Sequence, residues 1–219
     1  MMSFPLRRFI VFNRIAIAVV LIALGLLLGF KVTWWIAWIP FLIAILMIVA
    51  HFMVGPMTLL QGYMEAGDME GAQKMLGKVK NPKWLYKPLR SSYYMLRGQL
   101  SAGSDNLDMA EADFKQSLAS GMTEKGAEGT AYLQLGSIAA KKGNIKEAYD
   151  HFRQAVKLGL PDKDSEAMAF LQLSNLSLNR RDFRGAKMYF TRAKACKATN
   201  AQVVEQLKEM AKYMARIPG

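Results

Sequence analysis

The sequence predicts an all-α protein in which a transmembrane hairpin of two helices precedes a solenoid of helical hairpins. Three observations lead to this fold class. The segment 1–55 holds no Asp or Glu, it contains two long apolar runs, and the rest of the chain repeats itself at a fixed period. Of the 29 Lys and Arg residues, four lie within 1–55, which leaves 25 basic against 17 acidic residues beyond that segment, a net charge of +8.

The two apolar runs, 9–30 and 33–54, have the length of membrane spans. Each is about 22 residues long, and a helix of that length extends about 33 Å, enough to cross a hydrocarbon core of about 30 Å. Arg14 can extend its side chain to the headgroups. Trp34, Trp35 and Trp38 open the second run and suit the boundary between lipid and water. We therefore predict a transmembrane hairpin over residues 1–55.

A cleaved signal peptide is the alternative interpretation, because Arg7 and Arg8 precede the first run. The length of that run, the lack of an A-x-A site after it and the second run that follows argue against cleavage. Basic residues gather before the first run and after the second, so the positive-inside rule places the N-terminus and the large C-terminal part in the cytosol. From the compact hairpin-plus-repeat design we expect an integral membrane protein of the bacterial inner membrane.

Small residues recur at helical spacing in both predicted spans. Gly25 and Gly29 share one face of the first span, and Ala37 and Ala44 lie in the second. Such strips let helices approach closely. Packing of the two spans against each other is the favoured interpretation, and a homo-oligomer formed through the hairpin is the alternative.

In the remainder of the chain, three residue positions recur at one fixed period, which equals the interval from Ala72 to Ala110. An Asp or Asn comes first, an alanine follows four residues later, and an aromatic or leucine four residues after that. The three series are Asp68, Asn106, Asn144 and Asp182; Ala72, Ala110, Ala148 and Ala186; and Leu76, Phe114, Phe152 and Phe190. The polar residue suits the N-cap of a helix, the alanine a close helix crossing, and the large side chain the space between neighbouring hairpins. Each unit is predicted to be helix, turn, helix.

The third unit carries the fullest pattern, at Tyr132, Leu135, Gly136, Ala139, Gly143, Ala148, Phe152, Ala155 and Pro161. This pattern resembles the tetratricopeptide repeat (TPR) family. The fourth unit has Ser174 in place of a glycine, the second has Arg97 where leucine is usual, and the first is the weakest match. The resemblance covers four repeats over 56–197. Their period, about 38 residues, is longer than the roughly 34 residues of the family. The resemblance implies an α-solenoid whose members bind protein partners.

The last segment suits the end of such a stack. Residues 201–217 place Val204, Leu207 and Met214 on one side of a helix. A stack of helical repeats needs a terminal helix with one polar face. We predict a C-terminal capping helix within 198–219.

The resemblance also implies a peptide groove, because the first helix of each TPR hairpin lines the concave side. By register, the groove residues are Gln61, Met64, Met95, Gln99, Leu133, Ser137, Lys141, Leu171, Asn175 and Asn179. Asn175 and Asn179 could bind the backbone of an extended peptide, or be solvated only. Leu133 and Leu171 stand where chaperone-binding members need lysine, so we do not expect a receptor for chaperone tails.

One basic stretch near the second span contains aromatic residues. Its cations are Lys78, Lys80, Lys83, Lys87 and Arg90, around Trp84 and Tyr86. Elsewhere basic and acidic residues are mixed, which argues against nucleic acid as a partner. We expect the five cations to contact anionic membrane lipids of the inner leaflet.

The sequence offers no catalytic or cofactor-binding motif. It has no phosphate-binding glycine loop and no metal-ligand cluster. His151 and Cys196 fall on repeat helices as packing residues. We expect no enzymatic activity, no cofactor and no catalytic or metal-binding residue.

Together these observations predict a membrane-tethered, cytosol-facing scaffold that binds an unidentified protein partner or organises an assembly. The alternative is a small accessory subunit of a membrane transport or secretion complex, whose hairpin packs against other membrane subunits. Soluble partners would indicate the scaffold, and polytopic partners held by the full chain would indicate the subunit.

Overall fold

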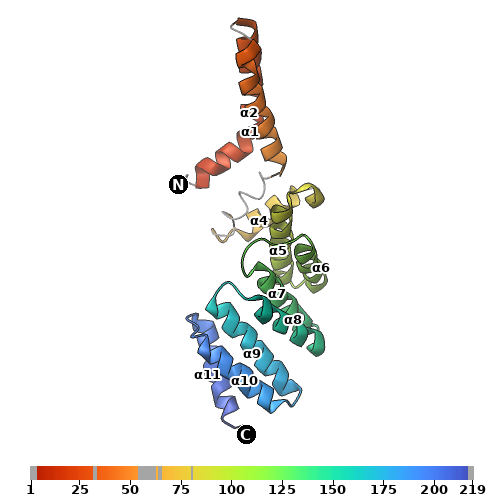
Figure 1. The fold of residues 1–219 in the computed structure, drawn as a ribbon, viewed down its shortest axis with the longest axis vertical. Helices are drawn as coiled ribbons and strands as arrows, with labels where there is room; N and C mark the ends of the chain where they lie inside the picture. The colour runs from red at the N-terminus through yellow and green to blue at the C-terminus, as the bar shows by residue number, and fades with distance from the viewer. Residues whose placement is uncertain (1–3, 32–33, 54–62, 64–65, 80, 217–219) are drawn as a thin grey trace. The chain divides into compact units, whose positions relative to one another are not determined.

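The structure is a computed structural model that describes residues 4–31, 34–53, 63, 66–79 and 81–216. Over these residues it contains ten α-helices, one short 3-10 helix and no strand (Figure 1). The predicted all-α class is confirmed. The chain divides into two compact units, Met1–Tyr93 and Tyr94–Gly219.

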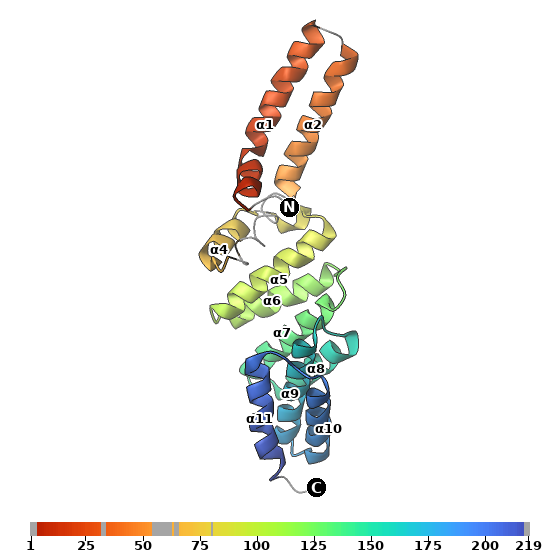
Figure 2. The ribbon, with the colours of Figure 1, turned by 90° about the vertical axis from the view of Figure 1, so that its left-hand side faces the viewer.

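The first unit contains a helical hairpin of α1 (Phe4–Lys31) and α2 (Trp34–Met53), which lie side by side and antiparallel (Figure 2). Small residues lie between them. Ala18 and Ala44 are fully buried, and a Cβ atom added at Gly25 would lie 3.1 Å from the Phe41 ring. In the part of the chain that the structure describes, no helix is both long enough and apolar enough to cross a membrane.

The first unit continues with α4 (Met69–Gly77) and the 3-10 helix η1 (Pro82–Trp84). In the predicted pattern, α4 is the second helix of the first repeat. Most of the helix expected before it falls outside the described residues. Tyr63, which is described, is buried.

The second unit is a stack in which consecutive helices pair as antiparallel hairpins. Starting from α5, which crosses the boundary between the units, the helices are α5 (Lys87–Gly103), α6 (Leu107–Ala119), α7 (Ala127–Lys141), α8 (Ile145–Leu158), α9 (Lys163–Asn179), α10 (Phe183–Ala195) and α11 (Ala201–Met214). Helix α6 packs on α7, α8 on α9, and α11 on both α9 and α10. Each hairpin therefore buries its apolar faces against the next, as a helical solenoid requires.

The turns inside the four hairpins share one geometry. In each, the backbone N–H of the capping residue donates to the carbonyl five residues earlier at 2.9 Å, in the pairs Asp68 to Tyr63, Asn106 to Ser101, Asn144 to Ala139 and Asp182 to Ser177. The residue before each cap has a positive φ: Gly67, Asp105, Gly143 and Arg181. Glycine adopts this left-handed conformation without steric cost, whereas Arg181 is held in it by the turn. The same turn thus recurs at the predicted repeat period.

The predicted helix caps form at three of the four positions. The side chains of Asp68, Asn106 and Asp182 accept hydrogen bonds from backbone amides in the first turns of their helices. Asn144 stands at the same position, but its side chain makes no capping bond. It donates weakly to Glu147 instead.

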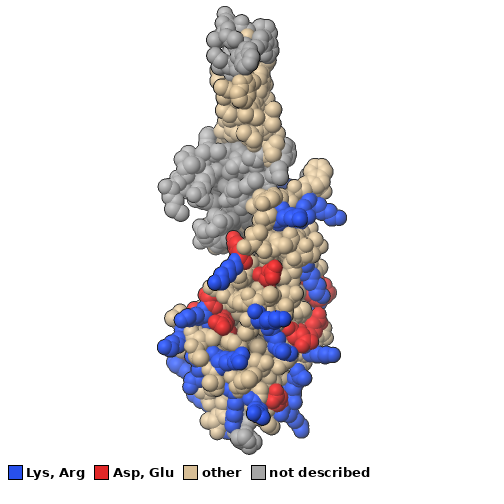
Figure 3. Space-filling view, viewed as in Figure 1, with Lys and Arg blue, Asp and Glu red and all other residues tan. Residues whose placement is uncertain are grey.

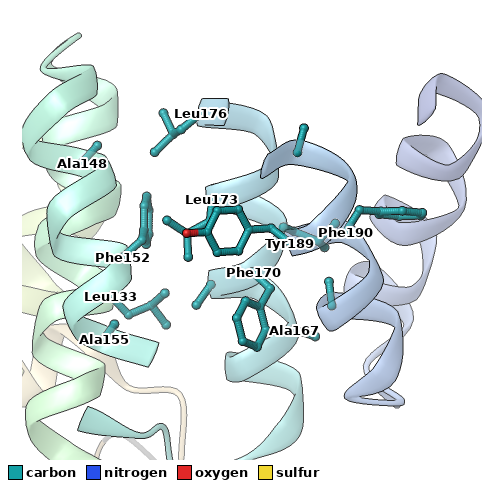
Figure 4. Packing of buried hydrophobic residues seen from close by; sticks show 14 of the residues in the cluster. Leu133, Ala148, Phe152, Ala155, Ala167, Phe170, Leu173, Leu176, Tyr189 and Phe190 are labelled. Carbon is teal, nitrogen blue, oxygen red and sulfur yellow. The ribbon is translucent and has the colours of Figure 1, made fainter. Parts of the chain in front are cut away.

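The core of the second unit lies on the predicted alanine and aromatic positions. Ala148, Ala186 and Phe152 are 0% exposed, and Phe190 is 9% exposed. Figure 4 shows Phe152 directed from α8 toward Leu173 on α9. The close crossing inside each hairpin is visible in the third repeat, where a Cβ added at Gly136 would lie 2.8 Å from the Phe152 ring.

The two departures from the repeat pattern each have a partner. Ser174, which replaces the glycine in the fourth repeat, is buried and donates to the Ala186 carbonyl at 2.8 Å. Arg97, which replaces leucine in the second, donates from Nε to the Asp113 carboxylate at 2.7 Å. The Asp113 side chain is 3% exposed, so the arginine neutralises a buried charge on the facing helix.

Candidate docking groove

A groove of about 450 Å³ runs between α9 and α11 in the second unit. Side chains from the outer face of α9 form one wall and those from α11 form the other. The lining residues are Leu171, Gln172, Asn175, Leu178, Asn179, Gln206, Glu209, Met210 and Tyr213.

The lining combines amide groups with apolar surface. Four of its members are Asn or Gln, whose side chains each offer two N–H donors and a carbonyl acceptor. The apolar side chains include Tyr213, which is 56% exposed. Among the described residues that line the groove, Glu209 is the one that carries a charge, and none is Lys or Arg.

The helical period explains which side of α9 faces the groove. Leu173, Ser174 and Ser177 are buried on the core side. Asn175 and Asn179 are exposed and lie four residues apart, so they project from the same face one turn apart. Leu171 lies one turn before Asn175 but is only 2% exposed, so it forms the floor rather than a free contact.

The connection that leads into α11, the second wall of the groove, is held by the carboxylate of Asp164 at the start of α9. Asp164 accepts hydrogen bonds from the backbone N–H groups of Thr199 and Asn200, at 2.6 and 3.0 Å, in the connection that leads into α11. Asn200 then caps α11 by accepting from the Gln202 amide at 2.9 Å. The backbone N–H groups of Asn200 and Thr199 lower the pKa of Asp164, so this carboxylate stays charged through the neutral range.

Three of the ten predicted groove residues lie in this groove: Leu171, Asn175 and Asn179. Gln61 and Met64 lie outside the described residues. Among the others, Met95 and Gln99 are half-buried on α5, Leu133 is 6% exposed, Ser137 donates to the Leu133 carbonyl, and Lys141 is exposed at the end of α7. The groove therefore gathers the predicted residues of the fourth repeat only.

The α11 wall was not among the predicted site residues, because that helix was expected only to cap the stack. The repeat period nevertheless indicates the position of this wall. Glu209 and Tyr213 follow Leu171 and Asn175 by one full repeat period, so α11 keeps the register of the first helix of a further repeat. Val203 and Met214, buried on the adjoining face of α11, hold this helix against the stack.

The basic stretch of the first unit has mixed roles. Lys78, Lys83 and Lys87 are exposed, as predicted lipid contacts must be, and Lys80 lies outside the described residues. Arg90 is half-buried, and its guanidinium donates to the Leu85 carbonyl at 3.0 Å and to the Lys83 carbonyl. It therefore braces the η1 turn. Trp84 and Tyr86, on the same turn, are 80% and 63% exposed.

The predicted packing residues of the hairpin are placed as follows. Gly25, Gly29 and Ala44 are buried, and the side chain of Ala37 lies outside the described residues. The Phe41 ring of α2 covers Gly25 of α1. These glycines and Ala44 therefore face the interior of the hairpin.

Neither Cys196 nor His151 lies in an activating environment. Burial raises the pKa of the Cys196 thiol, which donates to the Arg192 carbonyl at 3.3 Å. His151 lies 3.5 Å from the Glu147 carboxylate and packs against the Tyr132 ring. Within the described ranges, no three His, Cys, Asp or Glu side chains are grouped as metal ligands.

Comparison with known proteins supports the repeat assignment. Residues 129–158, which span α7 and α8, match the family described as Tetratricopeptide repeat. No curated protein matches the chain by sequence.

Three solved structures share the fold. The structure described as the APC/C hetero-tetramer Cut9-Hcn1 has a TM-score of 0.58 at 15% identity, over 86% of this chain and 35% of that chain. PilF of Pseudomonas aeruginosa has a TM-score of 0.56 at 15% identity, over 93% and 86%. BtubC (BKLC) from P. vanneervenii has 0.55 at 16% identity, over 92% and 83%. The chain thus spans about a third of the length of the first structure.

The fold and the family match define a TPR-type helical solenoid. The groove between α9 and α11 is one concave feature of this solenoid.

Proposed function

We propose that this chain is a non-catalytic scaffold, held at a membrane by its helical hairpin, which binds an extended segment of a partner protein in the groove between α9 and α11. The observation that carries the docking proposal is the lining itself. Four amide side chains from two helices face one groove that also contains apolar surface.

The lining fits an extended polypeptide for two reasons. A peptide backbone presents N–H donors and carbonyl acceptors alternately, and Asn or Gln can pair with either. Leu178, Met210 and Tyr213 can contact the side chains that point into the groove. The charge on Glu209 favours a neutral or basic segment and disfavours a free C-terminal carboxylate.

Photo-crosslinking tests the docking proposal. A photoreactive amino acid in place of Asn175, in the full chain in cells, is expected to give a covalent adduct with a discrete partner. The same amino acid in place of Gln116, which is exposed on α6, serves as the matched control. Adding Gln172→Ala and Gln206→Ala should reduce the Asn175 adduct about tenfold, because each lost hydrogen bond weakens binding by about 0.5–1.5 kcal/mol. Equal labelling from both positions, or no effect of the alanines, would contradict docking in this groove.

Two observations support the membrane tether. Among the side chains that the structure describes in α1 and α2, thirteen large apolar ones are exposed, for example Val20 at 66% and Leu46 at 58%. This is far more apolar surface than a hairpin surrounded by water carries. On the face seen in Figure 3, the described side chains of the hairpin are neither acidic nor basic, and the side chains of Arg7, Arg8, Arg14 and Lys31 lie outside the described residues. In the same unit, exposed Trp84 and Tyr86 beside Lys83 and Lys87 match the composition of a membrane interface.

Fractionation tests the tether. The full chain is expected to stay in the membrane pellet after an alkaline carbonate wash, because lipid replaces water around the apolar hairpin. A chain that begins after residue 55 is the control and should be released. The excess of Lys and Arg flanking the hairpin supports the further proposal that the repeats face the cytosol. For a bacterial inner membrane, a reporter that is active only in the periplasm should then remain silent when fused after Gly219. Release of the full chain by carbonate would refute the tether.

A further inference from the structure

Three arginines and two tyrosines gather between α8 and α10, away from the docking groove. We call Tyr149, Arg153, Arg180, Tyr189 and Arg192 the arginine–tyrosine cluster. They come from α8, from the C-terminal cap of α9 and from α10. None of them lines the groove between α9 and α11.

The two tyrosines join the helices at the base of the cluster. Their hydroxyl oxygens lie 3.1 Å apart, and their rings meet edge to face. Figure 4 shows the hydroxyl of Tyr189 directed toward α8. Tyr189 is 9% exposed and also stacks on Phe170 of α9. The tyrosine pair is therefore fixed by packing on both sides.

The three guanidinium groups lie over aromatic rings. Arg180 lies 4.8 Å and Arg153 5.9 Å from the centre of the Tyr149 ring, and Arg192 lies 5.9 Å from that of Phe170. A guanidinium that lies over a ring keeps the N–H groups at its edge available for an anion. The side chains are thus partly ordered before any ligand arrives, which reduces the entropy lost on binding.

The charges of these arginines are not balanced by carboxylates. Over the residues that the structure describes, no Asp or Glu forms an ion pair with Arg153, Arg180 or Arg192. Burial and the hydrogen bond with Tyr149 raise the pKa of Tyr189 to about 12, while nearby Arg153 and Arg192 act in the opposite direction. The Tyr189 hydroxyl therefore stays protonated beside two of the cations.

We infer that the arginine–tyrosine cluster binds an acidic segment of a partner protein, whose carboxylates pair with Arg153, Arg180 and Arg192. Arginine pairs with carboxylates through two parallel hydrogen bonds, which a fixed guanidinium favours. Met188, 44% exposed and one turn before Arg192, adds apolar surface for the segment.

The neighbourhood favours a peptide over a membrane or a nucleic acid. Asp150 is exposed next to Tyr149 and lies three residues before Arg153 on the same side of α8. This carboxylate would repel a continuous anionic surface or a chain of phosphates. A peptide can place its acidic side chains on the arginines and direct neutral residues toward α8.

The test uses the full chain and a fluorescent peptide of alternating Glu and Gly, with a Gln and Gly peptide as the neutral counterpart. Fluorescence anisotropy is expected to show binding of the acidic peptide and not of the neutral one. The combined variant Arg153→Gln, Arg180→Gln, Arg192→Gln should bind it at least about tenfold more weakly, or ~1.4 kcal/mol. The combination Lys125→Gln, Lys208→Gln, Lys212→Gln removes the same charge from exposed positions elsewhere and should bind like the unchanged chain.

Circular dichroism of both variants verifies that the helices remain. Equal weakening in the two variants would mean that net charge alone attracts the peptide, and would overturn the inference. So would unchanged binding after loss of the three arginines, or no binding of the acidic peptide by the unchanged chain. Vesicles containing phosphatidylserine form a separate arm. If they bind through the three arginines and the peptide does not, the cluster is a lipid site and the inference is wrong.

Discussion

Phe152→Ala is expected to lower the free energy of unfolding by about 4 kcal/mol, because it removes a large side chain that is fully buried between α8, α7 and α9 and leaves a cavity. The surrounding helices can fill that cavity only in part, because interiors are close-packed. Urea denaturation of the full chain, followed by circular dichroism, measures the loss.

Phe183→Ala is the matched control. It deletes the same atoms from the first residue of α10, where the phenylalanine is 41% exposed. Its cost should stay below about 1 kcal/mol, as for most surface substitutions. Similar losses for both changes would mean that Phe152 does not occupy the interior position described above.

The second large effect is expected at the pair formed by Arg97 and Asp113. Arg97→Leu leaves the buried Asp113 carboxylate without its partner and should lower the free energy of unfolding by about 3 kcal/mol. Adding Asp113→Leu should recover most of this loss, because an apolar pair can replace a buried ion pair at little cost.

A double-mutant cycle in the same urea experiment measures this coupling. If the effects of Arg97→Leu and Asp113→Leu simply add, the two side chains do not stabilise each other. Lys74→Leu provides a comparison, because Lys74 pairs with Glu70 while the two side chains are 72% and 78% exposed. Its effect should be within about 0.5 kcal/mol.

The fold of the repeats could be predicted because the same pattern of residues occurs four times along the chain. Each capping residue, alanine and aromatic has a local physical role, and the turn before each cap recurs with the same hydrogen bond. The partner of Arg97 could not be predicted in this way. Asp113 stands where the third and fourth repeats have His151 and Tyr189, so no periodic pattern marks it.

The docking groove could be predicted in part. Periodicity gives the side of a helix that faces away from the core, and the predicted residues Leu171, Asn175 and Asn179 are among those that line the groove. It does not tell which exposed faces a neighbouring helix turns into a groove. That depends on which helix packs against α9, and here it is α11. The arginine–tyrosine cluster was missed for a related reason, since its members come from three elements and share no repeat position.

The attachment of α11 by Asp164 gives the groove a property beyond its shape. Helix α11 is the last element described in a one-dimensional array, so it has described neighbours on one side only, and terminal elements open more often than interior ones. Whenever α11 detaches, the groove loses a wall while the other helices stay folded. The apparent affinity for a segment that touches both walls is then the intrinsic affinity multiplied by the fraction of time that α11 is closed. Through its hydrogen bonds to Thr199 and Asn200, Asp164 would thus tune the strength of docking without touching the docked segment.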